Sequence, residues 1–118
     1  MSPVLTIAER RQGAADILSL KGRMDATTSP EAEAHLTHLL DGGSRIIIVD
    51  LADLEYISSA GLRVLLAALK RLKQSGGELR LASLQPEIRK VFEIAGFHRL
   101  FPLYPGVAEV LLPSGTPR

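Results

Sequence analysis

The sequence predicts one α/β domain, with a mixed, mainly parallel sheet of four or five strands packed against about four helices. Its 118 residues, 46% of them apolar, suffice for one compact core and are too few for two ordinary domains. Short apolar runs alternate with segments of helical periodicity, an order typical of parallel strands joined by right-handed crossover helices. The first two apolar runs are separated only by a short polar segment, which indicates an antiparallel hairpin at the start.

Composition excludes several classes of function. The formal net charge of +1 comes from 14 basic and 13 acidic residues that are mixed along the chain, so no nucleic-acid-binding surface is expected. Cysteine is absent, which excludes disulfides and thiol chemistry. No apolar stretch approaches the roughly 20 residues needed to cross a bilayer, and the first residues do not resemble a signal peptide. We therefore expect a cytoplasmic protein without membrane insertion.

The hairpin is expected from apolar runs at residues 4–8 and 17–20, with a turn at Gly13 and the second strand ending at Gly22. A helix follows, for which Thr28 or Ser29 supplies the cap. Pro30 suits the first turn of this helix, and the glycine pair at residues 42–43 ends it.

A central strand is predicted at residues 45–51, because four consecutive β-branched residues lack the alternation of a strand with one wet face. Leucines from residue 62 to 72 then recur at helical spacing, and this helix ends near Gly76. The remaining predicted elements are a strand at 78–82, a helix at 86–95, an edge strand at 100–104, where Pro102 lacks a donor, a helix at 107–111 and a tail at 113–118.

The most informative residues lie between the central strand and the second helix, where Ser58, Ser59, Ala60 and Gly61 follow one another. Ser59 is predicted to cap the helix by accepting a hydrogen bond from an amide of the first turn. Capping accounts for only one of the two serine hydroxyls. The second serine, beside a small residue and a glycine, leaves an uncrowded surface that suits approach by another protein.

Enzyme and metal chemistry are weakly supported. The serines lack a GxSxG motif and a following acid and histidine, and Gly61 has no lysine behind it as a phosphate-binding loop requires. His35 and His38 are three residues apart on a helix, but no third ligand of matching placement occurs. We interpret both as surface residues and His98 as structural or solvated, and expect neither a metal nor a cofactor.

Two segments carry a resemblance to a known family: LKGRMDATTSPEAEAHL and, from residue 46, IIIVDLADLEYISSAGLRVLLAALKRLKQSGGELRLASLQPEIRKVFEIAGFHRLFPLY. The second segment resembles the STAS domain of bacterial anti-sigma factor antagonists. The first is similar to a segment of that family that ends in aspartate before the first helix. The strand, serine pair, Gly-Leu helix start, GG turn and third helix occur in register. The resemblance implies one STAS domain over residues 1–118, with a core at about 4–112.

The resemblance implies a regulatory protein rather than an enzyme. In the family, the unmodified antagonist binds an anti-sigma factor that is also a serine/threonine kinase, and this binding frees a sigma factor. The kinase then phosphorylates the antagonist, and a serine phosphatase restores it. Matching Gly61 and Leu62 to the family's Gly-Leu makes Ser59 the phosphoacceptor, and Asp25 matches the aspartate of a nearby loop.

The sequence departs from this family at two positions. Ser58 stands where many members have aspartate, and Ala60 where they have serine or threonine, so Ser58 is an alternative acceptor. The expected partner-binding residues are Asp25, Ser58, Ser59, Ala60, Gly61 and, on the exposed side of the helix, Arg63. The alternative function is a STAS interaction module without phosphorylation, belonging to a scaffold or to a lipid or anion transport system.

Overall fold

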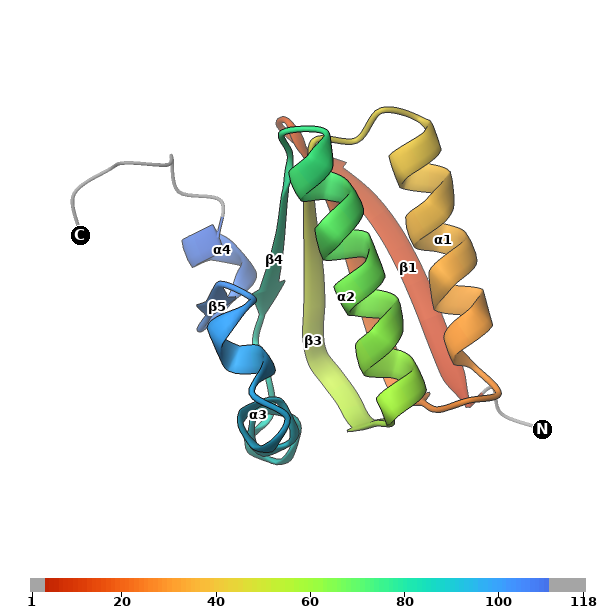
Figure 1. The fold of residues 1–118 in the computed structure, drawn as a ribbon, viewed down its shortest axis with the longest axis vertical. Coiled ribbons are helices and arrows are strands. Elements are labelled where there is room, and N and C mark those ends of the chain that lie inside the picture. Colours follow the sequence, from red (N-terminus) through yellow and green to blue (C-terminus); the bar gives the residue numbers. More distant parts are fainter. Residues whose placement is uncertain (1–3, 111–118) are drawn as a thin grey trace.

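The computed structural model describes residues 4–110, which form a five-stranded sheet with four α-helices and one 3₁₀ turn in this part of the chain (Figure 1). The elements are β1 (Leu5–Gln12), β2 (Ala15–Met24), α1 (Ser29–Asp41), β3 (Ile46–Ile57), α2 (Ser59–Gln74), β4 (Glu78–Ala82), α3 (Pro86–Ile94), the 3₁₀ turn η1 (Phe97–Arg99), β5 (Leu103–Tyr104) and α4 (Val107–Val110). The predicted tail at 113–118 and the end of the last predicted helix lie outside the described residues.

The strands lie in the order β1-β2-β3-β4-β5. β1 pairs with β2 in antiparallel fashion through a turn at Gly13, whose φ is +61°, and the other three pairs are parallel. Helices α1 and α2 lie side by side over one face of the sheet (Figure 1). The predicted fold class, a mixed and mainly parallel sheet with crossover helices, is confirmed.

The core lies mainly between the sheet and these two helices. Alternate residues of β2, β3 and β4 point into it and meet leucines from the helices; the fully buried members include Leu18, Leu20, Ile47, Val49, Leu36, Leu65 and Leu72. On the opposite face Ile17 and Ile48 pack with Val107 of α4. Strand β3 is therefore buried on both faces, as its run of β-branched residues predicts.

β3 is longer than predicted, because it continues through the polar passage after Leu51 to Ile57. Its pairing with β2 shifts register between Ser19 and Lys21 and again between Gly22 and Arg23, each time giving β3 one extra residue. Leu51, Leu54 and Ile57 consequently reach the core at intervals of three residues instead of two. The prediction that the strand ends at residue 51 was wrong because these bulges break the alternation expected of a strand.

β2 also extends past its predicted end at Gly22, because Arg23 and Met24 pair with Tyr56 and Ile57 of the lengthened β3. Two paired strands thus run beyond β4, whose pairing with β3 stops at Asp50. This two-stranded extension leads directly to the serine pair. Within residues 4–110 no helix is long and apolar enough to span a membrane.

Candidate functional site

The candidate site is built where β2 and β3 end next to each other. Met24 is the register partner of Ile57, and the Ser58 amide donates a hydrogen bond to the Met24 carbonyl oxygen at 2.9 Å. Because β2 and β3 are parallel, both strands end on the same side of the sheet. Asp25 and Ser58, distant in sequence, therefore start from neighbouring strand ends.

The two serines have different structural roles. Ser58 is the N-cap of α2: its backbone is extended, with φ −94° and ψ 175°, and its hydroxyl oxygen accepts a hydrogen bond from the Gly61 amide at 3.4 Å. Ser59 is the first helical residue and its side chain is exposed. Among residues 4–110 no group forms a hydrogen bond with the Ser59 hydroxyl. The prediction that Ser59 caps the helix was wrong, because the cap position needs the extended backbone that Ser58 inherits from β3.

Gly61 fixes the start of α2 against the strand ends. It is buried, and a Cβ atom built on it would lie 2.8 Å from Cγ1 of Ile57 and 3.0 Å from Cγ of Met24. Real Cβ atoms do not approach carbon atoms this closely, so only glycine fits without a shift of the buried neighbours. Ala60 beside it is half-buried and Arg63 is exposed, so both border the surface around Ser59.

The electrostatics at this helix start favour an anion. α2 is 16 residues long and has no acidic residue in its first turn. The amide groups at a helix N-terminus carry a partial positive charge, which stabilises a negative group placed there. The exposed Ser59 hydroxyl is therefore at a position where a phosphate would be tolerated by the fold.

Asp25 organises the loop that precedes α1. Its Oδ1 atom accepts hydrogen bonds from the Thr27 amide at 2.9 Å and the Thr28 amide at 3.0 Å. The bond from the Thr28 amide is the main reason that the pKa of the Asp25 carboxyl is lowered. The carboxylate is therefore ionised at neutral pH and largely engaged within its own loop.

The prediction that the side chain of Thr28 or Ser29 caps α1 was wrong. Thr28 occupies the N-cap position, but its side chain makes no capping bond to the helix; its hydroxyl donates to the Arg23 carbonyl oxygen at 2.8 Å. Ser29 lies inside the first turn, and its buried hydroxyl oxygen has no hydrogen-bond partner among residues 4–110. Asp25 instead accepts hydrogen bonds from the Thr28 amide through its carboxylate and from the Ser29 amide, at 2.8 Å, through its carbonyl oxygen.

The sequence pattern did not single out two residues near the ends of β2 and β3. Arg23 of β2 stacks on the ring of Tyr56 of β3, with the guanidinium carbon 4.3 Å from the ring centroid. Both side chains are exposed. Sequence spacing gives no signal for the contact, because the two residues meet only through the register of β2 and β3.

The histidines do not converge on a metal site. His35 contacts Glu9 of β1, His38 borders a surface hollow, and His98 lies in η1. The part of the chain that the structure describes holds no group of three potential metal ligands.

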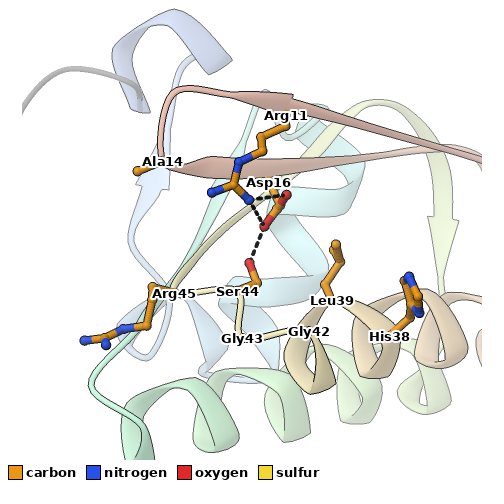
Figure 2. Close-up of a pocket in the computed structure, with 9 residues that line it drawn as sticks. All are labelled: Arg11, Ala14, Asp16, His38, Leu39, Gly42, Gly43, Ser44 and Arg45. Atoms are coloured by element: carbon orange, nitrogen blue, oxygen red, sulfur yellow. Dashed lines mark hydrogen bonds and ion pairs between the residues drawn. The ribbon is translucent and has the colours of Figure 1, made fainter.

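The surface hollow beside His38 has a volume of about 350 Å³ (Figure 2). It lies where β2 and β3 begin, at the end of the sheet opposite to the serine pair. Figure 2 shows Asp16 between Arg11 and Ser44: the guanidinium donates to the carboxylate at 3.2 Å and the Ser44 hydroxyl donates to it at 2.5 Å. These bonds tie the β1–β2 hairpin to the loop after α1. Since the carboxylate is occupied by two donors, we interpret this cluster as a structural junction rather than a catalytic one.

The sequence comparisons identify the family. The STAS domain model matches residues 6–110. BtrV of Bordetella bronchiseptica, named as a candidate anti-sigma factor antagonist, is 46% identical over 87 residues, which are 74% of this chain and 75% of BtrV. The anti-sigma-B factor antagonist of Staphylococcus aureus is 37% identical over 79 residues, 67% of this chain and 73% of that protein. Both names describe regulatory proteins and neither describes an enzyme.

Solved structures share the fold at lower sequence identity. An anti-sigma factor antagonist from Mycobacterium paratuberculosis matches with a TM-score of 0.84 and 23% identity, over 91% of each chain. The phosphorylated form of the Bacillus protein SpoIIAA matches with a TM-score of 0.73 and 19% identity, over 90% of this chain and 96% of SpoIIAA. The extent of the family match and the level of identity to the relatives make this chain a member of the STAS domain family.

Proposed function

We propose that this chain is an anti-sigma factor antagonist whose binding is controlled by phosphorylation of Ser59. In the unmodified state it binds an anti-sigma factor with serine/threonine kinase activity, and the bound anti-sigma factor releases its sigma factor. The kinase then transfers a phosphate to Ser59 and the complex dissociates. A serine phosphatase removes the phosphate and restores binding.

The observation that carries the proposal is the contrast between the two serines. Ser58 uses its hydroxyl to cap α2, whereas the Ser59 hydroxyl is exposed and makes no hydrogen bond within residues 4–110. A kinase must reach the acceptor oxygen, and modification of the cap would remove a bond that stabilises the helix. Ser59 is therefore the better acceptor, and Ser58 is the alternative.

The physical effect of a phosphate at this position favours a binding switch. A phosphate adds about −1.5 to −2 charges at neutral pH, which the amino end of α2 accommodates. An interface pressed against Ser59 would instead bury that charge at a cost of several kcal/mol. Because each 1.4 kcal/mol is about tenfold in affinity, we expect binding to fall by two to three orders of magnitude.

The relatives support the same function. The Staphylococcus aureus and Bordetella bronchiseptica proteins are named for antagonism of anti-sigma factors, and SpoIIAA has a phosphorylated form. We propose that Ala60 and Arg63 form the partner surface together with the serines. Gly61, predicted from the sequence as a further contact, is buried and instead fixes the start of α2 beneath this surface. Asp25 contributes negative charge at the neighbouring strand end.

The test uses Ser59→Ala and Ser59→Asp as immobilised baits in an extract of the source bacterium, with and without ATP. We expect Ser59→Ala to retain an ATP-binding kinase, which mass spectrometry identifies, and Ser59→Asp to retain at least 100-fold less. Incubation of the wild-type chain with that kinase and ATP should place the phosphate on the Ser59 peptide, while Ser58→Ala remains a substrate.

Equal capture of the kinase by the two Ser59 variants would refute the switch. A phosphate found only on Ser58 would move the acceptor by one residue. Recovery of membrane transport components in place of a kinase would support the alternative, a STAS module without a phosphorylation cycle.

A further inference from the structure

Three side chains form a row across the strand ends next to Ser59. Val4, directly before β1, accepts a hydrogen bond through its carbonyl oxygen from the Arg23 amide at 2.8 Å, and Arg23 is the register partner of Tyr56. We call Val4, Arg23 and Tyr56 the strand-end row. Two members belong to the paired strands β2 and β3 and the third is hydrogen-bonded to β2, so their relative positions are fixed by backbone contacts.

The strand-end row faces away from the core beneath α1 and α2. The residues next to it in sequence, Leu5, Met24 and Ile57, are buried in that core. Successive side chains on a strand point to opposite faces, so the row itself points outward. Val4 is 49% exposed and Tyr56 40% exposed, and they are two of the four large apolar side chains exposed within residues 4–110.

Arg23 lies between the two apolar members and is open to a ligand. Its guanidinium is held over the Tyr56 ring. Within residues 4–110 the guanidinium forms no hydrogen bond and no ion pair. Asp25 is close enough for Arg23 to help lower the pKa of its carboxyl, but the Asp25 carboxylate is hydrogen-bonded to the Thr27 and Thr28 amides. The donor groups of Arg23 therefore remain available, already oriented by the aromatic ring.

We propose that the strand-end row is part of the surface that holds the anti-sigma factor, with Tyr56 as its apolar anchor and Arg23 as the binding group for an aspartate or glutamate of the partner. Tyrosine and arginine are enriched among the residues that dominate binding energy at protein interfaces. An arginine whose guanidinium forms no ion pair is complementary to a carboxylate of a partner. This inference rests on the proposed function and extends it to residues on the other side of the strand ends.

The distances are compatible with one continuous interface. Tyr56 and Ser59 are three positions apart in the chain, so their Cα atoms are no more than about 11 Å apart. A standard interface covers about 800 Å² on each partner, equivalent to a disc of roughly 16 Å radius. A partner centred on Ser59 therefore reaches the strand-end row when it covers this end of the molecule.

The experiment measures the affinity of the purified anti-sigma factor kinase, recovered with the Ser59→Ala bait, for Tyr56→Ala and Arg23→Gln by isothermal titration calorimetry. Arg10→Gln is the matched control, because Arg10 is an exposed arginine of β1 about 20 Å along the strand from Val4. We expect Tyr56→Ala and Arg23→Gln each to weaken binding at least tenfold, and Arg10→Gln to change it less than threefold. Arg23→Gln should also reduce the dependence of the affinity on salt concentration.

Circular dichroism and thermal melting establish that each variant is folded. Should Tyr56→Ala fail to fold, Tyr56→Phe and Arg23→Glu replace it: the first should bind normally and the second should bind more weakly than Arg23→Gln. Wild-type affinity in both row variants, with binding lost in Ser59→Asp, would overturn this inference and leave the proposed function intact. Equal weakening by Arg10→Gln would also overturn it, and failure of the wild-type chain to bind any kinase would refute the proposed function itself.

Discussion

Replacement of each serine by alanine separates the residue that stabilises the helix from the residue that we propose as the phosphoacceptor. N-cap serine to alanine changes cost about 0.5–2 kcal/mol. The bond from the Gly61 amide to the Ser58 hydroxyl oxygen is 3.4 Å long, beyond the usual range for such bonds, so we place the cost of Ser58→Ala at about 0.5–1 kcal/mol. Ser59 is exposed and already helical, so Ser59→Ala should change the free energy of unfolding by less than about 0.5 kcal/mol.

Urea unfolding followed by far-UV circular dichroism measures both free energies, and thermal melting gives an independent reading. For a domain of this size about 1 kcal/mol corresponds to roughly 4 °C in Tm, so Ser58→Ala should lower Tm by about 2–4 °C. Ser58→Asp is a useful third variant, because aspartate is an equally good N-cap and should retain stability. If Ser59→Ala were the destabilising change and Ser58→Ala were neutral, the assignment of the cap would be refuted.

Two further substitutions test how the site is held. Gly61→Ala should destabilise the domain by about 1–2 kcal/mol, because crowding against Ile57 and Met24 outweighs the higher helix propensity of alanine. Gly42→Ala is the control and should be tolerated, because the nearest atom to its new Cβ would lie 3.4 Å away. Equal Tm values for the two variants would contradict this prediction. Because folding lowers the pKa of the Asp25 carboxyl, the wild-type chain should be more stable than Asp25→Asn above about pH 4. Urea unfolding at a series of pH values should show this difference disappear as the pH falls through the folded-state pKa. A constant difference from pH 7 to pH 2 would argue against this reasoning.

The fold class was predictable because it depends on the order of apolar runs, which is a property of the sequence alone. The hairpin, the parallel order and the buried centre of β3 all follow from that pattern. The end of β3 was not predictable in this way. Its last residues read as a polar passage because two bulges bring Leu51, Leu54 and Ile57 inward at intervals of three.

The site was predicted in part. The sequence locates the serine pair at the start of a helix, but which hydroxyl caps that helix depends on one backbone conformation, the extended φ and ψ of Ser58. The role of Asp25 in its own loop depends on hydrogen bonds to Thr27 and Thr28 rather than on residue type. The Arg23–Tyr56 contact depends on pairing between strands distant in sequence, which the residues alone do not reveal.

The close packing of Gly61 on Met24 and Ile57 means that the first turn of α2 has no room to move inward. The phosphorylated and unphosphorylated chains should therefore have nearly the same backbone and differ in charge alone. Small-angle scattering would give one curve for both forms, whereas isoelectric focusing would separate them. Under the proposed switch, the partner would then distinguish the two states by charge, without a rearrangement of this chain.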